Sequence, residues 1–178
     1  MSCLINAAIP LDCISGLGGI KTAYFLAGEI ATTTVTAGEI TAISGTGTFY
    51  EYALPKDTAF FSEAINVSNT AGTVFYEGVL TIILQKMSAA KRNQILLLAG
   101  NRDLKIAFVD QQDITWLVGL DRGCVMSASS AATGTAPADA NQYSLSFTSQ
   151  EPVAAYPIEA GSSLADVVGG GLTVVAAA

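Results

Sequence analysis

Strand-forming residues dominate the first half of the chain, where they occur in four separate runs before any helix signal. These runs are rich in β-branched and aromatic residues, alternate partly with polar residues, and lie at residues 20–27, 48–54, 59–67 and 72–86. Such composition and alternation are typical of β-strands. Turn residues at 55–57 and 68–72 separate the last three runs, which predicts a three-strand antiparallel meander over residues 48–86.

A short repeat, Ala-Gly-Glu-Ile, lies between the first two runs at residues 27–30 and again at residues 37–40. Each Ala-Gly-Glu predicts a turn, because glycine and acidic residues favour turns. The sequence therefore predicts a short strand with a turn on each side.

One strong helix signal follows, at residues 88–99. Ser88 suits the N-cap, and Gly100 suits a left-handed residue at the C-terminal end. Residues 95–98 read Ile-Leu-Leu-Leu and point in nearly all directions around a helix. This run predicts that the second half of the helix is buried on most sides.

The remaining chain returns to strand patterns. Residues 104–109 and 114–120 flank a polar turn and predict a hairpin, and residues 143–149 alternate large apolar residues with Ser and Thr. Residues 127–141 contain mostly small residues, which predicts a mobile loop. We expect a mainly β, antiparallel protein with one helix, folded as a single domain over residues 1–160.

The C-terminal segment, residues 161–178, is rich in Gly, Ala and Val. It is too short and too poor in large side chains to build a core by itself. Its two apolar runs favour an arm that pairs with a neighbouring subunit over a disordered tail.

Composition narrows the function. The 178 residues are 51% hydrophobic and only 13% charged, against about 25% in typical proteins, which indicates subunits that bury one another. The chain has no histidine, which excludes Ser-His-Asp and Cys-His catalysis and histidine metal sites. The net charge of −7 argues against a protein that grips nucleic acid phosphates.

The cysteine pattern and the lack of a recognisable secretory leader predict a reducing compartment. Cys3, Cys13 and Cys124 are odd in number and show no C-x-x-C spacing, so we expect reduced thiols that act as small hydrophobic residues. Residues 1–13 lack the basic region of a secretory leader, and no apolar run reaches the roughly 18 residues of a membrane span. We expect synthesis and first residence in the cytosol.

Motifs for catalysis or cofactors are weak. Residues 15–22 place Lys-Thr after a glycine cluster, but a phosphate loop needs glycine where Ile20 stands. Residues 110–113 lack the glycine and the spacing of a calcium loop. We expect no enzyme, no cofactor and no metal. A small carboxylate hydrolase remains the enzyme alternative, because many acids are available: Glu29, Glu39, Asp57, Glu63, Glu77, Asp110, Asp113 and Asp121.

The order of several motifs along residues 11–151 points to a known family. They are Leu11-Asp12-Cys13, Gly18-Gly19-Ile20-Lys21, Phe49-Tyr50-Glu51, residues 60–66, Gly72-Thr73-Val74-Phe75-Tyr76-Glu77, residues 92–99 and residues 143–148. In this order the chain resembles tail tube proteins of long-tailed phages that infect Bacteroidota.

The resemblance implies a β-sandwich or incomplete barrel flanked by one α-helix. It also implies homo-oligomeric rings of six subunits that stack into a hollow virion tail tube through which DNA is ejected. Its partners would be copies of itself, other tail proteins and DNA in transit, with no membrane insertion by this chain. A ring-forming tail terminator, adaptor or baseplate tube-like protein is the alternative within the same fold.

An acidic tube wall would repel DNA phosphates. Glu51, Glu63 and Glu77 fall on three successive predicted strands, which makes them candidates for lumen-facing residues. An ordinary solvated outer face explains the same three residues equally well.

Overall fold

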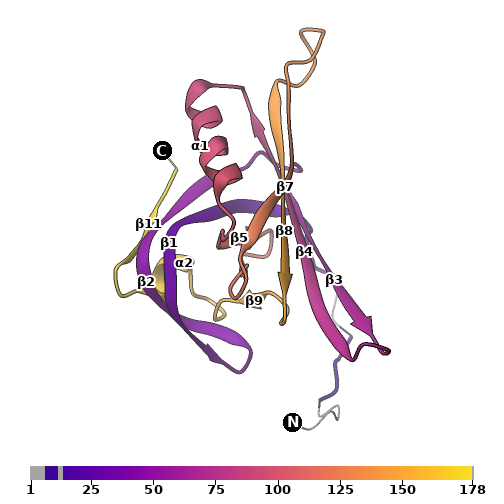
Figure 1. Cartoon of the computed structure of the whole chain (residues 1–178), viewed down its shortest axis with the longest axis vertical. Helices are drawn as coiled ribbons and strands as arrows, with labels where there is room; N and C mark the ends of the chain where they lie inside the picture. Colours follow the sequence, from indigo (N-terminus) through magenta and orange to yellow (C-terminus); the bar gives the residue numbers. More distant parts are fainter. Residues whose placement is uncertain (1–6, 12–13, 178) are drawn as a thin grey trace.

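Two sheets form the framework of the chain (Figure 1), as described by a computed structural model over residues 7–11 and 14–177. The four-stranded sheet has the order β3-β4-β8-β7, with strands β3 (Phe60–Ser68), β4 (Thr73–Gln85), β8 (Gln142–Glu151) and β7 (Cys124–Ala132). The seven-stranded sheet has the order β10-β2-β1-β5-β6-β9, and β11 also pairs with β2. Its strands are β1 (Ile20–Thr36), β2 (Glu39–Ala53), β5 (Ile106–Asp110), β6 (Thr115–Val118), β9 (Tyr156–Pro157), β10 (Val168–Gly169) and β11 (Leu172–Val175). The four-stranded sheet is antiparallel, and the seven-stranded sheet is antiparallel except where β10 and β11 pair with β2.

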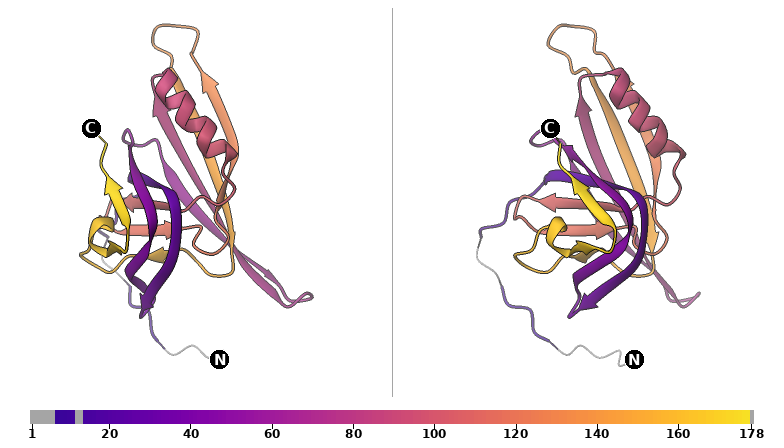
Figure 2. Two further views of the ribbon diagram at one scale, coloured as in Figure 1. Left: turned by 60° about the vertical axis from the view of Figure 1, so that its left-hand side comes forward. Right: turned by 90° about the vertical axis from the view of Figure 1, so that its left-hand side faces the viewer.

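This architecture confirms the expected mainly β, sandwich-like fold with one long helix. The seven-stranded sheet curls strongly (Figure 2) without closing into a barrel.

The first Ala-Gly-Glu was predicted as a turn, and this prediction is wrong. Strand β1 runs straight through Gly28, and only Ala37-Gly38 turns the chain into β2. Gly28 lies opposite Gly47, where the two backbones approach so closely that a Cβ on Gly28 would lie 2.1 Å from the carbonyl oxygen of Thr46. Glycine serves here for close backbone approach rather than for a turn.

The predicted three-strand meander is also wrong in its first strand. Strands β3 and β4 pair as a hairpin, whereas β2 belongs to the seven-stranded sheet. The turn after β2, held by the hydroxyl of Thr58 donating to the carbonyl oxygen of Pro55 at 2.6 Å, carries the chain from one sheet to the other. Alternation marks strands but carries no information about which sheet a strand joins.

At β5 the seven-stranded sheet is buried on both faces. On β5, Ile106 and Phe108 pack into a core between the two sheets, and Ala107 packs into a second core on the opposite face. The first core takes Leu80 and Phe147 from the four-stranded sheet. No described element covers the other face of the four-stranded sheet, so that face is open.

The helix α1 (Ala89–Gly100) begins where the sequence predicts. Ser88 accepts a hydrogen bond from the backbone N–H of Lys91 at 3.3 Å. Gly100 is the last residue of the helix, and its backbone is not left-handed, contrary to the prediction. The C-cap is Asn101.

The predicted burial of the second half of α1 is wrong. Leu98 is buried against the first core, whereas Leu96 and Leu97 are 56% and 68% exposed. The reason is that the helix contacts the rest of the chain along one flank only.

Residues 127–132 of the predicted mobile loop are strand. Strand β7 extends through Ala132 and pairs with β8 up to Gln142, so the segment forms a long hairpin. A bulge between Met126 and Ala128 shifts the register of this pairing.

The C-terminal segment lies on its own chain in this structure. Strands β10 and β11 run parallel to β2, with Leu172 opposite Gly47 and Val175 opposite Tyr50. Helix α2 (Leu164–Val167) starts with a capping box between Ser163 and Asp166. Because Leu164, Val167 and Leu172 are buried in the second core, the segment contributes to the core of a single subunit.

Glu151, at the end of β8, holds the crossover between the two sheets. Its carboxylate accepts hydrogen bonds from the backbone N–H groups of Asp121 at 3.1 Å and Arg122 at 3.0 Å, in the connection from β6 to β7. Burial raises the pKa of Glu151, and the hydrogen bond from Arg122 partly opposes this effect. The position of β7 relative to the seven-stranded sheet therefore depends on this carboxylate.

We expect Glu151→Ala to lower the free energy of unfolding by about 1–3 kcal/mol, because the N–H groups of the crossover lose their acceptor. Glu151→Gln keeps one acceptor and should lose less. Since the folded pKa exceeds the unfolded value, protonation stabilises the fold at low pH, and this contribution disappears as pH rises through the raised pKa. Urea unfolding of wild type and Glu151→Gln between about pH 4 and pH 7 should therefore show the variant gaining relative stability as pH rises. A pH-independent difference would contradict this role.

Candidate assembly surface

The open face of the four-stranded sheet carries mostly uncharged polar and apolar side chains. Residues paired across antiparallel strands share a face, so the register assigns each residue to the core face or the open face. On β8 the open face presents three hydroxyl groups between two amides: Gln142, Ser144, Ser146, Thr148 and Gln150. A hydroxyl contact of 3.1 Å between Thr81 and Ser146 joins this row to β4.

The open face carries almost no charge. On β4 it presents Phe75, Glu77, Val79, Thr81 and Ile83, on β3 Phe60, Ser62, Ala64, Asn66 and Ser68, and on β7 Val125, Ala128, Ser130 and Ala132. Among the residues of these four strands, all of which are described, Glu77 is the only charged residue on this face. The chain contains fifteen acids and eight bases, and the four strands place only one of them on this face.

Both edges of the four-stranded sheet are unpaired within the described chain. Strands β3 and β7 end the strand order, and each is nine residues long. A single bridge between Leu104 and Cys124 occupies the first residue of β7, and the rest of its outer side is free. An open edge with free N–H and C=O groups tends to pair with another chain.

The two edges are staggered along the strand direction. Strand β3 pairs with β4 from Thr73 to Thr81, whereas β7 lies opposite the part of β8 that pairs with β4 from Gly78 to Gln85. Closing a sheet into a barrel requires such a stagger, because the strands must tilt relative to the axis.

The strand directions also suit a ring. Neighbouring strands of the four-stranded sheet alternate in direction, so β3 and β7 run in opposite directions. A copy related by rotation about an axis along the strands would bring its β3 antiparallel to β7 of the first copy. The antiparallel pattern would then continue around the ring without interruption.

The structure does not bring Glu51, Glu63 and Glu77 onto one wall. Glu51 lies in the seven-stranded sheet opposite Tyr24, and its carboxylate accepts from the backbone N–H of Ala177 at 3.0 Å. Burial, with a smaller effect of Glu51, raises the pKa of Tyr24. The other two acids lie in the four-stranded sheet, on opposite faces. Glu63 shares a face with Gly78, its partner on β4, and Glu77 directly precedes Gly78 along β4, so its side chain points to the other face.

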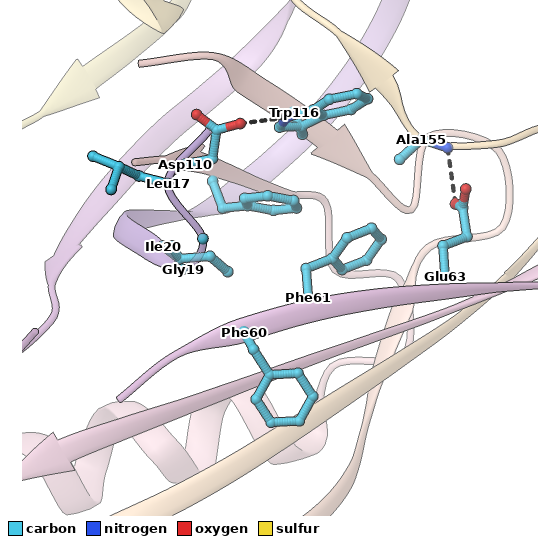
Figure 3. Close-up of a pocket in the computed structure, with 11 residues that line it drawn as sticks. Leu17, Gly19, Ile20, Phe60, Phe61, Glu63, Asp110, Trp116 and Ala155 are labelled. Atoms are coloured by element: carbon cyan, nitrogen blue, oxygen red, sulfur yellow. Dashed lines mark hydrogen bonds between the residues drawn. The ribbon is translucent and has the colours of Figure 1, made fainter. Parts of the chain in front are cut away.

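A cleft of about 420 Å³ lies on the core side of β3 (Figure 3). Phe61 and Glu63 point toward the cleft, and Phe60 points to the other side of the strand. This view agrees with the register, which places Phe60 on the open face.

The cleft contains two carboxylates, each engaged with the backbone. Asp110 accepts from the N–H groups of Gln112 at 2.8 Å and Ile114 at 3.0 Å with one oxygen, and from the Trp116 indole at 3.2 Å with the other. Glu63 accepts from the N–H of Ala155 at 2.9 Å, at the opposite end of the cleft (Figure 3). These contacts explain both side chains as parts of the β5–β6 turn and of the connection after β8. They do not point to a pair poised for acid–base chemistry.

Other predicted features lie as follows. Residues 15–19 form a loop into β1 at Ile20, so no helix follows the glycine cluster. Cys124 is buried, and burial raises its pKa to about 12, which makes its thiol unreactive. Cys3 and Cys13 lie outside the described residues.

Residues 7–11 and 14–177 contain no cluster of three or more His, Cys, Asp or Glu that could hold a metal. No helix in that part of the chain is long and apolar enough to cross a membrane.

The sequence analysis did not predict the open face and the free edges of the four-stranded sheet. The alternation in residues 143–149 signalled a half-buried strand, but sequence alone does not show that its polar side faces an uncovered sheet. Comparison with known proteins identifies no relative, since no family model, no curated protein and no solved structure matches the chain.

Proposed function

We propose that this chain is a structural subunit of a phage tail tube, which forms rings by pairing β7 of one copy with β3 of the next. The observation that carries the proposal is the four-stranded sheet, with two free, staggered edges and an open face. Ring closure removes both edges and turns exposed backbone groups into specific contacts. The resemblance to tail tube proteins supports six copies per ring and stacking of the rings.

In such a ring the open face of the sheet lines the lumen. Its hydroxyl and amide groups stay hydrated, and it carries no lysine or arginine to hold a phosphate. Glu77 adds one carboxylate per subunit, which repels DNA weakly and uniformly around the wall. The wall is therefore suited to let DNA slide, although it is less acidic than a wall carrying all three predicted glutamates.

Negative-stain electron microscopy of the purified protein over a concentration series tests this proposal. We expect hollow rings at low concentration and tubes of uniform diameter at high concentration, because both contacts follow mass action. Closed rings that never stack at any concentration would instead indicate a terminator, adaptor or baseplate protein. Monomers at every concentration, with or without DNA, would contradict self-assembly and return attention to the cleft beside Glu63.

A further inference from the structure

Two exposed apolar groups lie toward opposite ends of the long axis of the molecule (Figure 1). One is the tip of the β3–β4 hairpin, where Ile65 is 63% and Val67 62% exposed. The other is α1, where Leu96 and Leu97 are exposed. None of these four side chains belongs to either core, and exposed apolar groups often mark interaction sites.

The segment that contains α1 is basic, whereas the rest of the chain is acidic. Residues 86–102 hold four of the eight basic residues and no acid, and the four are Lys86, Lys91, Arg92 and Arg102. The remaining residues of the chain hold all fifteen acids and four bases. Residues 60–85 hold no base and two acids, of which Glu63 shares the face of Ile65 and Glu77 lies on the other face. Opposite charges therefore favour the approach of a second copy of this chain to α1.

The two groups also lie on the same side of the four-stranded sheet. Ile65 and Val67 share the core face with Phe61, as the register shows, and α1 packs on that face through Leu98. A hairpin that reaches past the end of its own subunit would thus bring its apolar side toward the helix of the next subunit. The lateral edges of β3 and β7 are not needed for this contact.

We propose that the β3–β4 hairpin of one copy docks on α1 of a second copy of this chain, head to tail along the strand direction. The contact joins two different surfaces, so it does not close on itself and can be repeated without limit. The interpretation as a stacking contact rests on the rings proposed above. In those rings the contact would join one ring to the next. It also explains why Leu96 and Leu97 of α1 stay exposed in a single chain.

Two double variants test the contact, one at each end: Leu96→Ser with Leu97→Ser, and Ile65→Ser with Val67→Ser. Their side chains are exposed, so circular dichroism and thermal melts should match wild type. Each variant alone should give single rings in place of tubes. Mixed in equal amounts, each has the intact surface that the other lacks, so ring pairs should form and growth should stop at two rings.

The matched control is Val35→Ser with Ile114→Ser, which removes exposed apolar side chains elsewhere and should leave tubes unchanged. Tubes of normal length from either test variant, no pairs in the mixture, or an equal loss in the control would overturn the proposal. If wild type formed no rings, sedimentation would still decide the contact. Wild type would then give linear chains of single subunits, and the mixture would give two-chain complexes.

Discussion

Deletion of residues 162–178 is expected to unfold the subunit rather than only to block assembly. Leu164, Val167 and Leu172 are buried in the second core, beside Ile43 and Phe49 of β2. Burying such a side chain contributes about 1.5–3 kcal/mol, so three contribute about 5–9 kcal/mol. A domain is stable by only about 5–15 kcal/mol. The deletion also strips β10 and β11 from the edge of β2. Circular dichroism and thermal melting of the truncated chain should show loss of the cooperative transition.

A graded series separates packing from length. Deleting only residues 176–178 leaves β11 intact and removes the contact between the Ala177 N–H and Glu51, so stability should change little. Leu172→Ala should fall between the two, at a cost of about 2–5 kcal/mol. A truncated chain that melts like wild type but no longer assembles would contradict the core role. It would support the arm that the sequence predicts, exchanged with a neighbouring subunit.

Local features of the fold could be predicted from the sequence because they depend on local chemistry. The N-cap at Ser88, the hairpin turn at Asp110 and the strand after Tyr143 all follow from nearby residues. The turn wrongly placed at Gly28 shows the limit. Its glycine is required by Gly47, which lies on another strand and leaves no mark in the local pattern.

The candidate site was less predictable for the same reason. Three glutamates on successive strands suggested one wall, but the chain changes sheets after β2 and the period of two places Glu63 and Glu77 on opposite faces. Leu96 and Leu97 suggested a buried helix, although the single chain buries Leu98 and only partly covers Ile95. In both cases the missing information is which surfaces the rest of the chain, or another copy of it, covers.

The free edge of β7 allows the ring contact to be tested without disturbing the fold. Cys124 exchanges hydrogen bonds with Leu104, so its N–H and C=O point away from β8. In antiparallel pairs the direction alternates along the strand, and β8 keeps a regular register with β4. Counting along β8 from Ser149 to Leu145 places Ser129 with its backbone groups on the free side. The next residue, Ser130, directs its own groups toward β8.

Two neighbouring proline variants should therefore have opposite effects. Ser129→Pro removes an N–H from the free edge and places a ring where the next copy would pair, so the subunit should fold and ring formation should be lost. Losing one hydrogen bond of about 1 kcal/mol, together with the clash, should raise the concentration needed for rings at least about tenfold. Ser130→Pro breaks the ladder between β7 and β8, so its melting temperature should fall.

Melting curves and negative-stain micrographs of both variants, with Ser129→Ala as the side-chain control, give the answer. Ser129→Ala should assemble like wild type, because the proposed ring contact uses the backbone and not the hydroxyl. A folded Ser129→Pro protein that still forms normal rings would show that subunits meet elsewhere and would remove β7 from the contact. If Ser129→Pro is the unstable variant and Ser130→Pro the stable one, the assignment of the free edge is wrong. The ring contact would then have to be built from the other set of backbone groups.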